Sequence, residues 1–313
     1  MRKFLITLTL AALACAPARA ADVTRIVVPF AAGGPVDQVA RVLAPGLSAA
    51  LGRSVVVDNR GGAGGTIGAN VVAKSAPDGQ TVLIATSGFV FAAGTTPDLP
   101  YDPRKDLEPV ALIGEVQTLL VVRPSLGVNT IADLVAKARS GAQLSYGSTG
   151  VGSTMHVGGE LLNLAAGTHV LHVPYKGAAP ALVDLIGGRI DMLNADVPVL
   201  QPYVKDGRVK ALVIYDTKRS PKLPDVPTSV EAGFPQLQMS NFYGAMVAAG
   251  TPADLRAHLE AAFLKVVRSP EVAGKLSDAG LSGPLTAAAY RAKLDAEFDR
   301  WIPFLKKAGI RAE

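Results

Sequence analysis

The segment RIVVPFAAGGPVDQVAR (residues 25–41) places a short apolar run, a loop of small residues and the start of a helix in direct succession. An apolar run that ends near glycine is typical of a buried strand. The helix that follows begins with N–H groups that have no partner inside it, and its dipole attracts anions. We therefore predict that backbone donors around Gly33 and Gly34 face a small anion. Asp37 would repel that anion, so we expect it to orient the loop, a bound water or an amino group.

A second unit of the same kind lies about 115 residues further along the chain. The segment LSYGSTGVG (residues 144–152) is a strand-like start followed by a Gly/Ser/Thr loop, and a helix is predicted over 153–166. Each loop would aim backbone N–H groups at an anion. Two such loops on one chain predict a clamp that holds a ligand between two lobes.

Strand-like and helix-like segments alternate along nearly the whole chain. This alternation predicts an α/β fold with two mostly parallel or mixed sheets flanked by helices, whose ligand site lies at the carboxyl ends of strands. Two apolar runs, 110–122 and 210–215, enclose a block of about a hundred residues. We predict that 124–221 form an inserted second lobe, that 21–123 and 222–313 form the first lobe, and that two crossing strands join them as a hinge.

Residues 1–20 have the pattern of a secretory signal peptide. Arg2 and Lys3 precede an apolar stretch at 4–14, and Ala18-Arg19-Ala20 is a cleavage site. The apolar stretch is too short to span a bilayer, and no other stretch of the sequence is apolar for long enough. We therefore predict export to the periplasm and cleavage after Ala20.

Removal of this peptide changes the composition of the chain. The formal charge falls from +5 to +2, because the peptide holds three basic residues and no acidic one. Without a dense Lys/Arg cluster, and with 5% aromatic residues, the chain has no pattern for binding nucleic acid. Cys15, the only cysteine, is either a small apolar residue of the peptide or a lipidation site. A mature chain without cysteine excludes disulfides, thiolate catalysis and cysteine-based zinc sites.

Signatures of catalysis and metal binding are absent from the sequence. The glycine run at 61–65 lacks the lysine of a phosphate-binding P-loop, and is either a flexible connection or a point of contact between lobes. No G-x-S-x-G surrounds a serine. His169 and His172 are three apart in a predicted strand, so they cannot share a metal. We therefore predict no metal site and no cofactor. We also predict that the protein is not an enzyme, because the alternative, a secreted hydrolase, would need a nucleophile–base pair or a metal set that the sequence does not show.

A few side chains are candidates for ligand contact. Thr86 and Ser87 follow a buried strand at the end where side chains line a cleft, although they could instead cap the following turn. His156 lies in the first turn after the second glycine loop. It is either hydrogen-bonded locally or in contact with ligand or water.

Short motifs throughout the mature chain resemble those of one protein family. They are VVPFAAGGPVD (27–37), VVVDNRGGAGG (55–65), APDG (76–79), YGSTG (146–150), HVPYKG (172–177), KRS (218–220), LPDVPT (223–228), YG (243–244) and AGTP (249–252). In this unbroken order they closely resemble the solute-binding proteins of tripartite tricarboxylate transporters, the Bug family.

The resemblance implies a periplasmic protein of the Venus-flytrap type that binds small carboxylates and hands them to the membrane permease subunits. It implies that backbone groups and ordered waters at Phe30–Pro35 and at Ser148–Ser153 hold the ligand carboxylate. We expect the protein to be a monomer. The alternative to a role in transport is a sensory subunit that presents the ligand to a membrane kinase. The ligand contacts that we predict are Phe30, Ala32, Gly33, Gly34, Asp37, Thr86, Ser87, Ser148, Thr149, Gly150, Ser153, His156, Tyr175, Lys176, Asp196 and Tyr243.

One segment departs from the family pattern. Where the family usually has Phe-Asp-Asn, this chain has Asn194-Ala195-Asp196. The change moves the carboxylate by one residue, just past the end of a predicted strand. We expect Asp196 to disfavour a second acidic group on the ligand, unless it caps the helix predicted to begin near Val199.

Overall fold

The computed structural model describes residues 23–311. The predicted signal peptide, with Cys15, lies outside the described residues. Within 23–311 no helix combines the length and the apolar character needed to cross a membrane.

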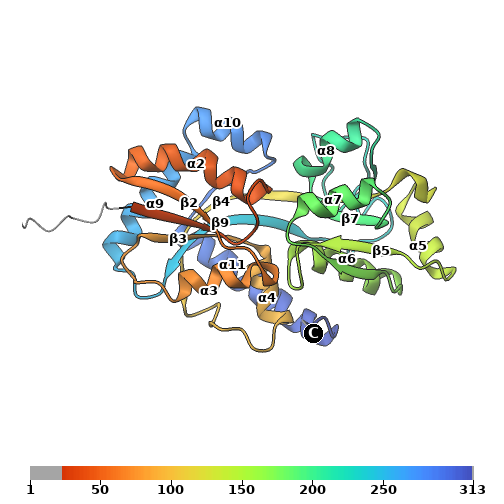
Figure 1. Ribbon diagram of the computed structural model, residues 1–313, viewed down its shortest axis with the longest axis horizontal. Coiled ribbons are helices and arrows are strands. Elements are labelled where there is room, and N and C mark those ends of the chain that lie inside the picture. The colour runs from red at the N-terminus through yellow and green to blue at the C-terminus, as the bar shows by residue number, and fades with distance from the viewer. Residues whose placement is uncertain (1–22, 312–313) are drawn as a thin grey trace, which may run out of the picture.

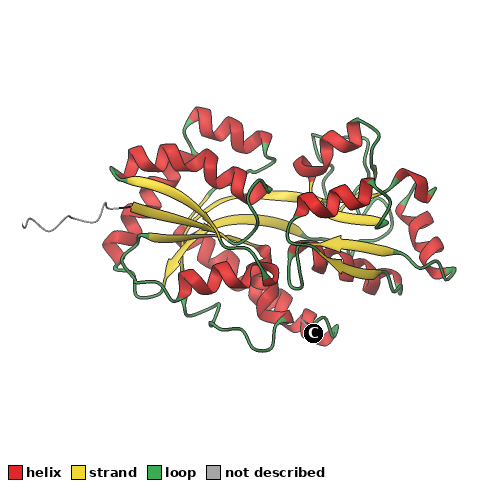
Figure 2. Ribbon diagram, in the orientation of Figure 1, coloured by secondary structure: helices red, strands yellow, loops and turns green. Residues whose placement is uncertain are grey.

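The chain alternates strands and helices from end to end (Figure 2). The strands are β1 (Val23–Val28), β2 (Ser54–Asn59), β3 (Thr81–Thr86), β4 (Leu107–Val122), β5 (Ser145–Ser148), β6 (Leu171–Pro174), β7 (Met192–Asp196), β8 (Lys210–Ile214), β9 (Ser240–Ala248) and β10 (Leu285–Thr286). The α-helices are α2 (Pro35–Leu51), α3 (Thr66–Ala73), α4 (Ser87–Thr95), α5 (Ile131–Arg139), α6 (Thr154–Ala166), α7 (Ala178–Ile186), α8 (Val197–Lys205), α9 (Ala253–Val267), α10 (Pro270–Asp278) and α11 (Ala287–Lys307). Short 3-10 helices lie at Ala63–Gly65 and Pro124–Leu126.

Two lobes share one continuous path of strands in the order β2-β1-β3-β9-β4-β7-β5-β6, with β8 and β10 also paired to β4. The pairs β1–β2, β1–β3, β5–β6 and β5–β7 are parallel, whereas every pair that involves β4 or β9 is antiparallel. The predicted two-lobe α/β architecture with mixed sheets is therefore confirmed.

The strand β4 crosses between the lobes. Its residues Leu107–Gln117 pair with β9 in the first lobe, and Thr118–Val122 pair with β7 and β8 in the second. The chain returns through the segment between β8 and β9, where Tyr215 N–H donates to the Thr118 carbonyl at 2.9 Å. Figure 1 shows β4 and β9 side by side where the lobes meet.

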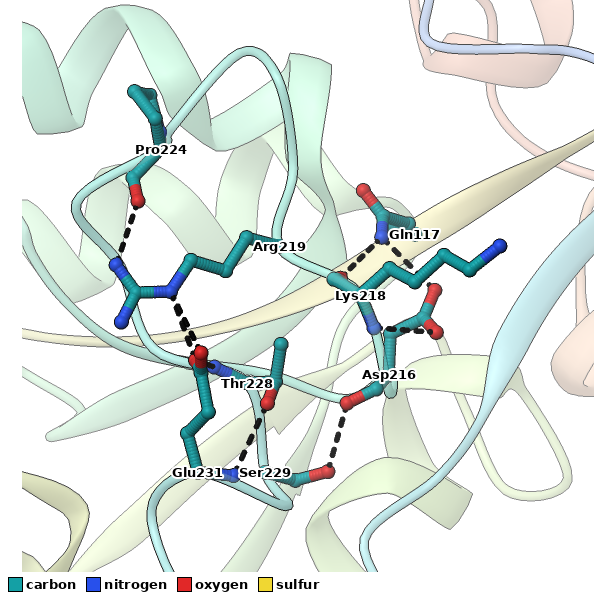
Figure 3. Close-up of polar contacts among 8 residues, drawn as sticks. All are labelled: Gln117, Asp216, Lys218, Arg219, Pro224, Thr228, Ser229 and Glu231. Atoms are coloured by element: carbon teal, nitrogen blue, oxygen red, sulfur yellow. Dashed lines mark hydrogen bonds and ion pairs between the residues drawn. The ribbon is translucent and has the colours of Figure 1, made fainter.

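Polar contacts hold the return segment beside β4 (Figure 3). The Gln117 amide Nε2 donates to Asp216 Oδ2 at 2.9 Å and to the Lys218 carbonyl at 2.8 Å. The Arg219 Nε donates to both carboxylate oxygens of Glu231, at 3.0 and 2.9 Å. The Gln117 bonds fix the second crossing against the first, and the bonds between Arg219 and Glu231 brace the return segment itself.

The two faces of the sheet are packed differently. On one face a single apolar core runs through both lobes and packs beneath α3, α4, α6 and α11. On the other face the core is divided: one part lies under α2 and α9 in the first lobe, and another under α7 and α8 in the second. Figure 1 shows α2 and α10 on this face of one lobe and α7 and α8 on the same face of the other. A cavity lined by residues of α2, α7, α8 and α10 lies between the lobes on this divided face.

Contacts of residues 222–239 bear on where the second lobe ends. Leu223 packs in the core under α7 and α8, and Gln201 Nε2 donates to the Lys222 carbonyl at 2.8 Å. Both contacts are with the second lobe. We propose that this lobe continues to Met239, beyond the predicted boundary at residue 221.

Candidate ligand-binding site

A cavity of about 100 Å³ lies between the lobes, where the carboxyl ends of β1, β3 and β7 meet the crossing strands. It opens beside a larger cavity of about 880 Å³ that shares Gly34, Asp196 and Tyr243 with it and is bounded by α2, α7, α8 and α10. The smaller cavity is lined by Phe30, Ala31, Ala32, Gly34, Pro35, Val36, Thr86, Thr118, Thr149, Thr154, Met155, Gly177, Ala178, Ala179, Pro180, Asn194, Ala195, Asp196, Val199, Asn241 and Tyr243.

The first glycine loop is held from behind by Asp37. The Asp37 Oδ2 accepts hydrogen bonds from the Gly33 N–H at 2.9 Å and from Arg41 Nε at 2.8 Å. Burial acts to raise the pKa of Asp37, but the hydrogen bonds from Arg41, Gly33 and Asn59 outweigh it, and the pKa lies below its ordinary value. Asp37 does not line the cavity. Of the roles expected for Asp37, the bond to Gly33 supports orientation of the loop, and contact with the ligand stays a prediction.

Glycine has different roles at the two positions of this loop. Gly33 has φ +81°, in the left-handed region that favours glycine. Gly34 is extended, with φ −77° and ψ 170°, so its backbone does not require glycine. Gly34 lines both cavities, whereas Gly33 lines the larger one. Gly33 thus provides the left-handed turn of the loop, and Gly34 provides the backbone that lines the smaller cavity.

Five helices begin at the smaller cavity. Residues at the starts of α2, α4, α6, α7 and α8 line it. Side chains cap two of these helices: Thr86 Oγ1 accepts from the Gly88 N–H, and Ser153 Oγ accepts from the His156 N–H. No side chain within residues 23–311 caps α2, α7 or α8. Because helix N-termini carry partial positive charge and free N–H groups, the cavity is suited to an anion.

The second glycine loop has one residue on the cavity, Thr149. Ser148 Oγ lies 2.5 Å from His172 Nε2, behind the loop. Gly150 N–H donates to Ser148 Oγ at 3.0 Å. Ser153 caps α6, as described above. Of the predicted contacts in this loop, Thr149 lines the cavity. Ser148, Gly150 and Ser153 instead make hydrogen bonds within the protein that shape the loop.

His156 lies behind the second loop in a stack of rings. Its ring centroid is 4.4 Å from that of His172 and 6.4 Å from that of Tyr146. Its Nδ1 accepts from the Gly152 N–H at 3.3 Å. Burial, together with the neighbouring His172, lowers the pKa of His156 to about 3, so the ring is neutral near pH 7. Of the two interpretations of His156, the structure supports the local hydrogen bond.

Three other predicted residues lie away from the cavity lining. The Ser87 hydroxyl accepts from the Phe242 N–H at 3.1 Å and donates to the Ser240 carbonyl at 3.2 Å, so it joins α4 to β9. The Tyr175 hydroxyl donates to Asp184 Oδ2 at 2.9 Å. Lys176 is exposed, next to the start of α7.

Asp196 lines the cavity and is buried, with 7% of the residue exposed. Its Oδ2 accepts from the Tyr243 hydroxyl at 2.5 Å, and both its oxygens accept from Asn241 Nδ2, at 3.1 and 3.2 Å. Burial raises the pKa of Asp196 to about 6, against the lowering effect of these hydrogen bonds. Asp196 is the N-cap residue of α8, but its side chain makes no capping bond. The alternative of a helix cap is therefore wrong.

Other residues at the cavity were not predicted from the sequence. Thr118, Asn194 and Asn241 belong to the central strands β4, β7 and β9, and Gly177–Pro180 to the start of α7. A glycine before a predicted helix, as at Gly177, was a usable signal. Asn194 lies two residues before Asp196 on one strand, so both side chains point to the same face. Within the described residues no group of three or more His, Cys, Asp or Glu side chains could hold a metal ion.

Comparisons with known proteins agree with this geometry. The model of the tripartite tricarboxylate transporter family receptor matches residues 39–310. The chain is 34% identical to protein BugT of Bordetella pertussis over 313 residues, which cover 98% of this chain and 96% of BugT. It is similar to the structure of MatC from Rhodopseudomonas palustris with bound malate, at 33% identity and a TM-score of 0.85, covering 90% of this chain and 98% of that one. It is also similar to an R. palustris protein, Rpa4515, with adipate, at 35% identity and a TM-score of 0.86, covering 92% and 98%.

Proposed function

We propose that this chain, which belongs to the tripartite tricarboxylate transporter receptor family and is a Bug-type periplasmic binding protein, captures a small organic carboxylate between its lobes and delivers it to the permease subunits of such a transporter. The protein catalyses no reaction on the solute. It works as a monomer in the periplasm, to which the signal peptide at 1–20 directs it.

The observation that carries this proposal is the convergence of five helix N-termini on one cavity. Among the described residues that line it, none is a lysine, arginine or histidine. Charge neutralisation of the ligand therefore comes from backbone N–H groups and helix dipoles. Each helix terminus contributes about 0.3–2 kcal/mol, whereas micromolar affinity needs about 8 kcal/mol. Hydrogen bonds and enclosure between the lobes supply the rest.

We place the ligand carboxylate at the uncapped start of α2, beside Gly34 and Val36. The second lobe contributes Thr149 and the start of α7, which begins at Gly177 beside the first loop: a Cβ on Gly177 would lie 3.5 Å from the Ala31 Cβ. A ligand in this position contacts both lobes at once. Phe30 and Ala32 form the wall of the cavity on the first-lobe side.

A thermal-shift screen of the mature protein against a carboxylate library tests the proposal, because a ligand that binds only the native state raises the melting temperature. Calorimetry of Gly34→Val then tests the location. The valine side chain would narrow the cavity, so affinity should fall at least about tenfold while the melting temperature stays close to wild type. Gly274→Val is the matched control, because Gly274 lies on α10 with open space around it. Unchanged affinity in Gly34→Val would contradict the placement of the anion at this loop.

A further inference from the structure

Three polar side chains form one surface of the cavity, which we call the polar floor: Thr118, Asn194 and Asp196. Thr118 of β4 lies directly opposite Asp196 of β7 in the antiparallel register. Asn194 precedes Asp196 by two residues on the same strand, so the three side chains share one face of the sheet. All three are buried, at 1%, 0% and 7% exposure in the order given. The register of the two strands therefore brings them together.

The polar floor has hydrogen-bonding capacity that the described residues do not use. The Thr118 hydroxyl and the Asn194 amide oxygen have no hydrogen-bond partner among the described residues. The Asn194 amide nitrogen faces the Tyr215 hydroxyl, which itself donates to the Gly158 carbonyl at 3.3 Å. Buried polar groups without partners are costly and rare in native proteins. Here they line a cavity, where a polar group of a ligand can pair with them.

The charge at the polar floor is negative. Among the described residues lining the cavity, Asp196 alone carries a formal charge near neutral pH. It stands at the N-cap of α8 and so offsets the positive end of that helix. Its neighbours Asn241 and Tyr243 donate to it but bring no positive charge. A second anion placed here would meet a like charge in a site with little water, whereas a donor group would meet an acceptor.

We propose that the polar floor is a subsite for an amino or hydroxyl group, so that the solute is a small amino or hydroxy acid with one carboxylate. Its carboxylate lies at the start of α2, and its donor group lies against Asp196, Asn194 and Thr118. This assignment rests on the proposed function, because it presumes that the carboxylate binds at the glycine loop. The charge of Asp196 further implies that the protein selects against dicarboxylates.

Matched ligand series test the assignment by calorimetry at pH 7.5. At each chain length from three to six carbons, the series compares the ω-amino acid, the ω-hydroxy acid, the unsubstituted monocarboxylate and the dicarboxylate. At four carbons these are 4-aminobutyrate, 4-hydroxybutyrate, butyrate and succinate. At the best chain length, an amino or hydroxy acid should bind at least about tenfold more tightly than the dicarboxylate, as expected for a hydrogen bond to a charged group. Stronger binding by the amino acid than by the hydroxy acid would identify an ammonium group as the donor.

Asp196→Asn identifies the residue responsible. The amide keeps the shape and most of the contacts to Asn241 and Tyr243 while it removes the charge, and it should reduce the preference over the dicarboxylate at least about tenfold. Asp206→Asn is the control, because it removes an equal charge at the exposed far end of α8. A dicarboxylate that binds wild type best, or an unchanged ranking in Asp196→Asn, would overturn the assignment. If no carboxylate of any series binds, the proposed function itself fails, and the inference fails with it.

Discussion

Gly64 of the first lobe lies so close to Val151 of the second that a Cβ on Gly64 would stand 2.1 Å from the Val151 carbonyl oxygen. The two glycine-rich segments at 61–65 and 150–152 thus meet face to face, since a Cβ on Gly150 would lie 3.0 Å from the Gly64 nitrogen. Of the two interpretations of the run at 61–65, the structure supports a point of contact between lobes. A side chain at Gly64 would keep the lobes apart.

Gly64→Ala should therefore weaken ligand binding by preventing the lobes from meeting. Gly64 has φ +64°, so alanine also strains the backbone by about 1 kcal/mol. We expect an affinity loss of about tenfold or more in calorimetry and a larger radius of gyration in small-angle scattering. Gly52→Ala separates the two effects, because Gly52 has φ +66° but open space around its Cβ position. Equal affinity in the two variants would show that the contact between the loops does not matter for binding.

Asp37 should support binding from outside the cavity. Asp37→Ala removes the carboxylate that accepts from the Gly33 N–H, and a hydrogen bond to a charged group is worth about 1.5–3 kcal/mol, so the loop is freed. We expect calorimetry to show an affinity loss of about tenfold. Arg41→Met removes the ion pair but keeps the bond between Gly33 and Asp37, so it should bind as wild type does. Weakened binding in both variants would assign the effect to the ion pair rather than to the loop.

The raised pKa of Asp196 predicts how stability depends on pH. The pKa rises from the ordinary value of 3.8 to about 6 because of burial. The folded state therefore holds this proton more tightly than the unfolded state, and the contribution of Asp196 to stability falls as pH rises from about 4 to above 6. At neutral pH the cost is about 3 kcal/mol. Asp196→Asn should accordingly be more stable than wild type at pH 7.5 and nearly equal to it at pH 4. Denaturant unfolding at both pH values measures the difference, and a constant difference would contradict a raised pKa.

Much of the fold was predictable because apolar periodicity is a local signal. The long apolar run at 110–122 became β4 (Leu107–Val122), and the loop before α2 proved to be part of the cavity. The helix α4 (Ser87–Thr95) was not predicted, because it is buried nearly all round and its sequence has no polar face. Its burial depends on α11, which is distant in sequence.

The cavity was less predictable than the fold because it depends on contacts between distant segments. Thr118 lies in the middle of an apolar run, and nothing in its neighbourhood in sequence distinguishes it. Its position opposite Asp196 follows from the register of β4 with β7. Ser148 and Ser153 stand in a loop with a binding pattern, but their hydroxyls bond to other protein groups, the His172 ring of β6 for Ser148 and the His156 N–H for Ser153. Whether a loop hydroxyl faces a ligand or the loop itself is decided by tertiary packing.

Closure of the lobes around ligand is the last prediction. The cavity is lined from both lobes, and these are joined by β4 and by the return to β9 (Figure 1). Rotation about these crossings would separate Gly64 from Val151 and open the cavity to solvent. Because a ligand that contacts both lobes stabilises the closed arrangement, saturating ligand should reduce the radius of gyration in small-angle scattering. Gly34→Val should need a ligand concentration at least about tenfold higher to reach the same reduction. Identical wild-type curves with and without ligand would mean that the lobes are already closed in its absence.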